Sequence, residues 1–379
     1  MWVALFTAMF APAPVMGLLA CIVSFFKSFR NNRPTWKTGT SMALFCLILL
    51  GRRWIHLLRP KSDDEPYVLA GEVHTAFGVD GTRLEWEELG PVDAPGILLV
   101  HGWSLTHDSW YYQKKALSHH YRVVFYDMRG NGRSEVPANR DYSIETLVSD
   151  LNCVYTDALL NLQPGGCALV GHSLGAMILP LFVARYGESS QNVRCIASIA
   201  GTDSPLLETM RGRGILRPMR RWFWEPLARS MGHNPRPYEW VARFLWEIGS
   251  IHMALMFGMH VGKETRGQDD LIARRCGHFS MAAAGLGAQS SFSFDARRDM
   301  QSISMPVLLM TGESDRNMPP EIQHAMASRL KNARVVIIPD CGHLGILECH
   351  REINAELNSF LCENLDDASL PLFAQPDGS

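Results

Sequence analysis

The chain has 379 residues, of which 47% are apolar and 20% are charged, so a sizeable core can be buried and broad disorder is excluded. Its formal net charge of -2 argues against a nucleic-acid-binding role. The nine cysteines form no C-x-x-C pair, and their odd number favours free thiols over a disulfide framework.

The N-terminal part differs from the rest of the chain in charge and hydropathy. Residues 1–62 contain eight basic and no acidic side chains, which leaves 28 basic and 38 acidic residues for the remainder. Residues 1–26 carry no charged side chain, and about 20 apolar residues suffice to cross a bilayer. We therefore expect residues 1–62 to form a membrane anchor followed by a basic juxtamembrane segment.

The topology of this anchor depends on a second, shorter apolar run. Residues 41–58 are either a marginal second crossing or an interfacial piece. The basic stretch from Lys27 to Lys37 is expected on the cytosolic side. We favour one span, which places the catalytic part in the cytosol. A hairpin would place it outside, and an apolar arm packed on the folded domain is a further alternative.

From about Tyr67 onward, short apolar runs alternate with segments of helical length. This pattern is typical of an α/β protein with a mostly parallel, doubly wound sheet. The core is expected to comprise residues 67–202 and 303–365. The expected strands are Glu72–Phe77, Thr82–Glu88, Ile97–Val100, Val123–Tyr126, Ala168–Val170, Cys195–Ile199, Val307–Met310 and Val335–Ile338. The expected helices include Ile144–Leu160, Leu174–Tyr186, Glu321–Leu330 and Ile353–Leu361.

Residues 203–302 interrupt this alternation. A loop of that length without structure is improbable in a compact domain, so we expect an inserted helical cap over the carboxyl ends of the strands, where ligands bind. The cap is rich in Trp, Phe and Met, most of them expected in helix cores, and an apolar roof suggests an apolar substrate. Residues 366–379 are predicted to be a flexible tail.

A basic and aromatic stretch lies within the cap. Five arginines precede the run Trp222-Phe223-Trp224, and they are Arg211, Arg213, Arg217, Arg220 and Arg221. The stretch is either a solvated helix face with an inward aromatic anchor or a surface that docks on an anionic membrane.

The sequence Gly171-His172-Ser173-Leu174-Gly175 follows an expected strand and precedes an expected helix. This is the context of a G-x-S-x-G nucleophile elbow, in which glycines allow a tight turn that exposes the serine Oγ at a helix N-terminus. Ser173 is therefore the candidate nucleophile.

A serine hydroxyl needs an adjacent base that is oriented by a third group. Asp315 and His343 each follow an expected strand, and the order Ser, Asp, His is that of this class of site. Glu313 is an alternative acid, whereas Asp340 is expected to form a turn. His324 and His350 fall within helix-length segments and are expected on the surface.

The oxyanion of an acyl-transfer reaction needs preorganised backbone donors. The N–H of Leu174, directly after the nucleophile, is one candidate. The other is the N–H of Trp103, in the stretch His101-Gly102-Trp103 that follows the strand Ile97–Val100. His101 is expected to brace this loop, and Gly102 to permit close backbone approach.

From about Glu72 to Leu361 the chain resembles the α/β-hydrolase family. The resemblance rests on the elbow, on the H-G-W stretch, on Gly312–Asp315, on the pair Gly342-His343, and on a D-x-R-G-x-G-x-S loop at Asp127–Ser134. It implies the α/β-hydrolase fold and a member similar to serine esterases and lipases. With the N-terminal segment described above, we expect this member to be membrane-anchored.

The resemblance leaves several reactions open. A serine at position 173 differs from epoxide and haloalkane hydrolases, which resemble this pattern but use Asp. The H-G-W stretch is similar to that of bacterial esterases with perhydrolase activity, but those commonly have Pro where this chain has Ser104.

We expect a serine hydrolase that cleaves a lipid or other apolar ester through an acyl-enzyme at Ser173, without metal or organic cofactor. The alternatives are a C–C bond or thioester hydrolase, a perhydrolase, and a non-catalytic ligand receptor with the same fold.

Overall fold

The computed structural model describes residues 61–62, 64–159, 166–187 and 189–365. Both apolar runs of the expected anchor and the expected tail lie outside the described residues. Within the described part, none of the helices combines the length and apolar character that a membrane crossing requires. These residues form two compact units, one made of Pro66–Pro235 with Phe279 onward, the other of the residues up to Glu65 with Arg236–His278.

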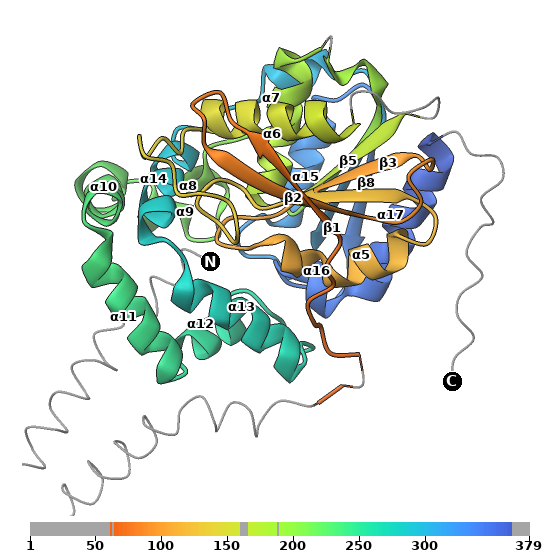
Figure 1. The fold of residues 1–379 in the computed structure, drawn as a ribbon. Coiled ribbons are helices and arrows are strands. Elements are labelled where there is room, and N and C mark those ends of the chain that lie inside the picture. The colour runs from red at the N-terminus through yellow and green to blue at the C-terminus, as the bar shows by residue number, and fades with distance from the viewer. Residues whose placement is uncertain (1–60, 63, 160–165, 188, 366–379) are drawn as a thin grey trace, which may run out of the picture. The chain divides into compact units, whose positions relative to one another are not determined.

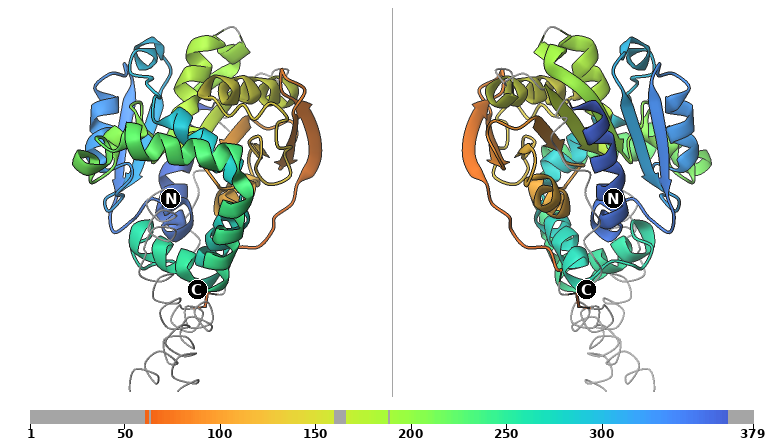
Figure 2. Two further views of the ribbon diagram at one scale, coloured as in Figure 1. Left: turned by 90° about the vertical axis from the view of Figure 1, so that its left-hand side faces the viewer. Right: turned by 90° about the vertical axis from the view of Figure 1, so that its right-hand side faces the viewer.

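The first unit is built on an eight-stranded sheet with the strand order β1-β2-β4-β3-β5-β6-β7-β8. The hairpin of β1 and β2 pairs antiparallel, as does β2 with β4, and all other neighbours are parallel. Figure 2 shows β1 and β8 at opposite edges of the sheet. The strands are β1 Glu72–Phe77, β2 Arg83–Leu89, β3 Gly96–Val100, β4 Arg122–Tyr126, β5 Cys167–His172, β6 Val193–Ile199, β7 Val307–Gly312 and β8 Ala333–Ile338.

Every expected strand is present, which confirms the predicted α/β-hydrolase fold. The central strands β3, β5 and β7 are buried at every residue, because helices cover both faces of the sheet. Figure 1 shows α6 and α7 on one side of the sheet and α5 and α17 on the other. The helices around the sheet are α5 Tyr111–Leu117, α6 Ile144–Leu159, α7 Leu174–Arg185, α15 Pro320–Ala327, α16 Gly345–Glu348 and α17 His350–Asn364, with short 3₁₀ turns at His107–Trp110, Ser189–Asn192 and Asp299–Ser302.

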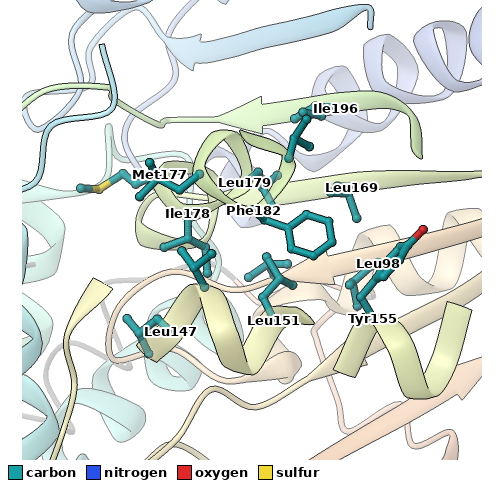
Figure 3. Packing of buried hydrophobic residues seen from close by; sticks show 14 of the residues in the cluster. Leu98, Leu147, Leu151, Tyr155, Leu169, Met177, Ile178, Leu179, Phe182 and Ile196 are labelled. Atoms are coloured by element: carbon teal, nitrogen blue, oxygen red, sulfur yellow. The ribbon is translucent and has the colours of Figure 1, made fainter. Parts of the chain in front are cut away.

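The core beneath the site lies between α6, α7 and the sheet. Leu151 and Tyr155 of α6 face Ile178 and Phe182 of α7, and all four side chains are buried (Figure 3). The rings of Tyr155 and Phe182 have centroids 5.2 Å apart. Helix α7 is apolar nearly all round because it is buried on most sides, and this packing fixes the helix whose first residue follows Ser173.

The insertion after β6 is helical, as expected, but it divides between the two units. The first and last parts of its sequence belong to the unit that holds the sheet. They comprise α8 Leu206–Thr209, α9 Arg213–Leu216, a π-helical turn at Arg220–Trp224 named η3, α10 Glu225–His233 and α14 Met281–Ser291. Helices α11 Pro235–Glu247, α12 Ser250–Gly258 and α13 Arg266–His278 form most of the other unit.

The aromatic residues of the insertion are less uniformly buried than expected. The side chains of Trp222 and Trp240 are 67% and 70% exposed, whereas Trp224 is 3% exposed. Residues two apart in a helical turn point to different sides of it, so only one of Trp222 and Trp224 can face the core.

Candidate active site

The nucleophile candidate Ser173 lies in the turn between β5 and α7. Its backbone has φ 53° and ψ -115°, in the left-handed half of conformational space that residues other than glycine rarely adopt. The Ser173 N–H donates to the carbonyl of Ile199 on β6 at 2.9 Å, which helps to hold the turn. A strained residue of this kind is found where the surrounding structure imposes it, and such residues cluster at active sites.

Two glycines let neighbouring loops approach this turn. A Cβ on Gly175 would lie 2.1 Å from the carbonyl oxygen of Val100, so the start of α7 packs directly on the end of β3. A Cβ on Gly102 would lie 3.1 Å from the Cβ of Ser173. The H-G-W loop therefore contacts the turn that holds Ser173.

The structure brings Ser173, Asp315 and His343 together from three loops that follow β5, β7 and β8. The His343 Nε2 lies 3.1 Å from the Ser173 Oγ, and its Nδ1 lies 2.8 Å from the Asp315 Oδ2. In the neutral imidazole, Nδ1–H donates to the carboxylate and Nε2 accepts from the serine hydroxyl. This tautomer leaves a base directly against the serine proton.

Asp315 is completely buried, and its two carboxylate oxygens have different partners. Oδ1 accepts the backbone N–H groups of Asn317 at 2.8 Å and Met318 at 2.9 Å. Burial acts to raise the pKa of Asp315, but the charge and hydrogen bond of His343, together with these N–H donors, lower it below its ordinary value. The carboxylate is therefore held in its charged form beside the imidazole.

The alternative acid, Glu313, is exposed and points elsewhere. Its Oε2 accepts the N–H of Asp340 at 3.4 Å. Asp340 is in the left-handed conformation with φ 48°, as a turn residue can be. Of the two carboxylates in this loop, the geometry supports Asp315 as the partner of His343.

The other histidine candidates lie outside this arrangement. His324 is exposed on α15, and His350 stacks on Tyr112 with ring centroids 3.6 Å apart.

The loop that carries His343 is held by the side chain of Glu348, which has no role assigned from the sequence, and by that of His172, a supporting residue of the expected elbow. Glu348 accepts the Gly342 N–H at 2.8 Å through Oε1, and the Nε2–H of His172 donates to the His343 carbonyl at 2.9 Å. Burial, with the charge of His343 nearby, lowers the pKa of His172 to about 3. His172 is therefore neutral over the range in which proteins are normally stable.

The sequence also assigned no role to Thr311. Its hydroxyl lies 3.2 Å from the Asp315 Oδ2 and 2.9 Å from the Met318 carbonyl.

His101 braces the loop that carries the second oxyanion candidate. Its Nε2 accepts the N–H of Met128 at 3.0 Å, so the proton resides on Nδ1, which lies 2.7 Å from the Gly102 carbonyl. Complete burial lowers the pKa of His101 and keeps this tautomer neutral. Both nitrogens thus bind backbone groups, and they fix the peptide from which Trp103 projects.

The ring of Trp103 lies against α14. A Cβ on Gly287 would be 3.6 Å from its Cζ2 and 3.8 Å from its Cε2. Six of the other ten residues of α14 are also small and buried, namely Ala282, Ala283, Ala284, Gly285, Ala288 and Ser291. The loop that carries Trp103 therefore meets α14 at Gly287, a residue without a side chain.

One group of possible metal ligands lies away from this site. Glu72, His74 and Glu88 on the β1–β2 hairpin place one donor atom each within 4.8 Å of one another. However, Glu88 also binds Arg122, whose Nε lies 2.6 Å from its Oε2. A guanidinium in this position neutralises one of the charges that a cation would need, so the group is better described as part of an ion pair.

The fold, the elbow and the buried Ser, His and Asp arrangement define a hydrolase of the α/β class. Residues 97–356 match the pattern of the Alpha/beta hydrolase family, and the chain belongs to that family.

The relatives of this chain are named for different activities. A non-heme chloroperoxidase of Streptomyces lividans is 37% identical over 288 residues, which cover 74% of this chain and 97% of that protein. A pimeloyl-[acyl-carrier protein] methyl ester esterase of Aliivibrio fischeri is 26% identical over 286 residues, covering 74% of this chain and 98% of that one. Among solved structures, a bromoperoxidase from Bacillus anthracis aligns with a TM-score of 0.61 at 22% identity, over 76% of this chain and 99% of the other, which shows the shared fold.

Proposed function

We propose that this protein hydrolyses carboxylic esters through an acyl-enzyme at Ser173. The observation that carries the proposal is the continuous hydrogen-bonded arrangement in which His343 lies 3.1 Å from the Ser173 Oγ and 2.8 Å from Asp315. This arrangement supplies a nucleophile, a base in contact with it, and a buried charge that orients the base.

In the first half of the reaction, the Ser173 Oγ attacks the ester carbonyl while its proton passes to the Nε2 of His343. The charged Asp315 stabilises the imidazolium that forms. The backbone N–H groups of Leu174 and Trp103 are the proposed donors to the oxyanion. His343 then returns the proton to the alkoxide, the C–O bond breaks and the alcohol leaves.

In the second half, His343 takes a proton from water, whose oxygen attacks the acyl-enzyme. The acid leaves, and the Ser173 Oγ regains its proton from Nε2. Each step moves one proton between oxygen and Nε2, so the chemistry needs only the residues of this site and water.

An apolar acyl group is the proposed substrate class, such as the chain of a lipid ester. The contact of the Trp103 ring with Gly287 supports it. Most buried residues of α14 are Ala or Gly, and such a helix offers no side-chain hydrogen bonds to a polar acyl group. The name of the esterase relative supports ester cleavage in general.

Membrane association, with the catalytic unit on the cytosolic side, is a separate proposal. It rests on the acid-free, basic sequence of residues 1–62. Protease protection in sealed vesicles tests it, since a cytosolic catalytic unit is digested without detergent.

Perhydrolysis is a second candidate, in which hydrogen peroxide replaces water and a carboxylic acid becomes a peracid and water. The name of the Streptomyces lividans relative favours it. Against it, Ser104 has φ 56°, whereas a proline at that position would need φ near about -65°. The loop beside Trp103 therefore cannot have the conformation that a proline imposes.

The deciding experiment is hydrolysis of p-nitrophenyl esters of increasing chain length, and of a monoacylglycerol, by the wild type and by Ser173→Ala. We expect sustained turnover that rises with chain length and is lost in the variant. Peracid formation from a carboxylic acid and peroxide, measured in parallel, tests the second candidate. Labelling of Ser173 by a fluorophosphonate without turnover of any ester would contradict the proposal and favour a ligand receptor.

A further inference from the structure

The segment Arg211–Trp222 forms a strongly basic surface on the unit that holds the sheet. Within it Arg211, Arg213, Arg217 and Arg221 are exposed and Arg220 is half-buried. The segment itself contains no acidic residue. We call this stretch the arginine surface.

Only part of this charge is neutralised locally. The Nε of Arg220 lies 2.8 Å from a carboxylate oxygen of Glu225, and that of Arg217 lies 3.9 Å from one of Glu208. Arg211, Arg213 and Arg221 are paired with no carboxylate among the residues that the structure describes. The surface therefore retains an excess of positive charge that faces solvent.

Large apolar side chains are exposed among these arginines. Ile215 is 72% exposed and Trp222 is 67% exposed. Trp224, in the same π-helical turn, is only 3% exposed and anchors the segment. A solvated helix face does not require an exposed Trp and Ile, whereas surfaces that lie in a membrane interface combine these features with arginine.

A cavity of about 260 Å³ opens within the arginine surface. Arg217, Arg220 and Arg221 line it together with the apolar side chains of Pro205, Leu207 and Phe292. Guanidinium groups bind phosphate oxygens through paired N–H donors. Glu208, which also lines the cavity, and Glu225 offset the charges of Arg217 and Arg220, which leaves Arg221 without a carboxylate partner among the described residues. An apolar floor with a basic rim matches a phospholipid headgroup that is continuous with its acyl region.

We propose that the arginine surface docks on bilayers that contain anionic phospholipid. The guanidinium groups meet the lipid phosphates and carboxylates, and Ile215 with Trp222 enters the interfacial layer. The residues responsible for this binding are separate from the catalytic site, and the binding can be tested without measuring turnover.

The same surface is joined to the catalytic site through packed helices. Helix α10, which continues directly from η3, packs on α14 so closely that a Cβ on Gly285 would lie 2.3 Å from the Ala228 carbonyl oxygen. Gly287, two residues further along α14, lies against Trp103. Docking through the arginine surface therefore fixes the orientation of the oxyanion loop relative to the bilayer, which suits an enzyme that takes substrate from that bilayer.

The test is co-sedimentation of the full chain with phosphatidylcholine vesicles that contain or lack phosphatidylserine. The triple variant Arg211→Gln, Arg213→Gln, Arg221→Gln removes only the unpaired arginines, so no carboxylate is left without a partner. Its matched control is Arg185→Gln, Arg194→Gln, Arg351→Gln, which removes the same charge from exposed positions elsewhere on this unit. Residues 1–62 are the same in every variant, so their own binding cancels in the comparison.

We expect the triple variant to bind phosphatidylserine vesicles about a hundredfold more weakly than the control at low salt, with equal binding to phosphatidylcholine alone. The single variant Trp222→Ser should weaken binding to both kinds of vesicle. Equal circular dichroism spectra and equal fluorophosphonate labelling show that the variants are folded.

Equal binding of the triple variant and its control to anionic vesicles would overturn the proposal. Glycerol 3-phosphate tests whether the arginine surface binds a soluble anion instead of a bilayer. We expect titration calorimetry to show no saturable binding of this compound to the protein. Saturable binding that the triple variant loses, with vesicle binding unchanged, would assign the surface to a soluble anion and also overturn the proposal.

Discussion

The buried imidazole of His172 holds the backbone of His343 through a hydrogen bond of 2.9 Å from Nε2 to the carbonyl oxygen. His172 is adjacent to Ser173 in sequence, so the residue next to the proposed nucleophile also contacts the loop that carries the proposed base. The distance from the Ser173 Oγ to the His343 Nε2 thus depends on a contact that involves neither atom. We therefore expect His172 to act as a positioning residue.

Replacing His172 by Phe is expected to lower kcat about tenfold to a hundredfold, with a smaller effect on KM. Phe fills the space but cannot donate to the His343 carbonyl, and small displacements of a base reduce turnover steeply. His172→Gln keeps an amide donor and should recover part of the loss. Steady-state kinetics on one ester decides the matter, since equal losses in the two variants would show that packing and not the hydrogen bond is responsible.

His172 also makes stability depend on pH. Burial lowers its pKa to about 3 in the folded protein, whereas the unfolded chain has the ordinary value near 6.5. Between these values the unfolded state binds more protons, so the free energy of unfolding falls as pH falls. The contribution of neutral His172 is complete above the unfolded pKa and is lost progressively below it.

The wild type should therefore lose stability relative to His172→Gln as the pH is lowered from about 6.5 to 4. The difference is expected to approach about 1.4 kcal/mol per pH unit. Urea unfolding at several pH values measures it, because His101 and the carboxylates are common to both proteins. Parallel stability curves for the two proteins would refute the assignment.

The positions of the strands and of the turn that holds Ser173 could be predicted because their signals are local. Strands such as β3 and β7 are short apolar runs, since both of their faces are buried, and their predicted bounds differ from the observed ones by one or two residues. Ser173 and His343 are marked by glycines that tight turns require.

Contacts between distant segments could not be predicted in this way. The choice between Asp315 and Glu313 depends on which of two carboxylates the loop after β7 turns inward. The contact of Glu348 with the Gly342 N–H depends on how α16 follows the histidine loop. The division of the insertion between two units depends on packing among helices, for which the periodicity of a single helix carries no information.

Asp315→Asn is expected to lower kcat by about 10³-fold to 10⁴-fold, because a neutral amide neither orients the His343 tautomer nor stabilises the imidazolium. Glu313→Gln, its matched control in the same loop, should remain within about twofold of the wild type, because its side chain is exposed and contacts a backbone turn. Single-turnover measurements on an activated ester separate these outcomes. Losses of similar size in the two variants would contradict the assignment of Asp315 as the acid.

Gly287 offers a test of how α14 supports the oxyanion loop. A Cβ at this position would lie 3.6 Å from the Trp103 ring, which is an ordinary van der Waals contact. Gly287→Ala should therefore leave kcat within about twofold of the wild type, and it should stabilise the helix by up to about 1 kcal/mol. Gly287→Leu places further carbon atoms where the indole ring lies.

The leucine variant is expected to displace Trp103 and its N–H, lowering kcat about a hundredfold, as loss of one oxyanion donor does. The measurement that distinguishes the two effects compares kcat with KM on short and long esters. A variant that only blocks the acyl group raises KM for long esters and leaves short esters unaffected. A loss of kcat on the shortest ester, with the alanine variant unaffected, supports the role of the Trp103 N–H. Full activity of Gly287→Leu on that ester would show that the loop affects only the binding of the acyl chain.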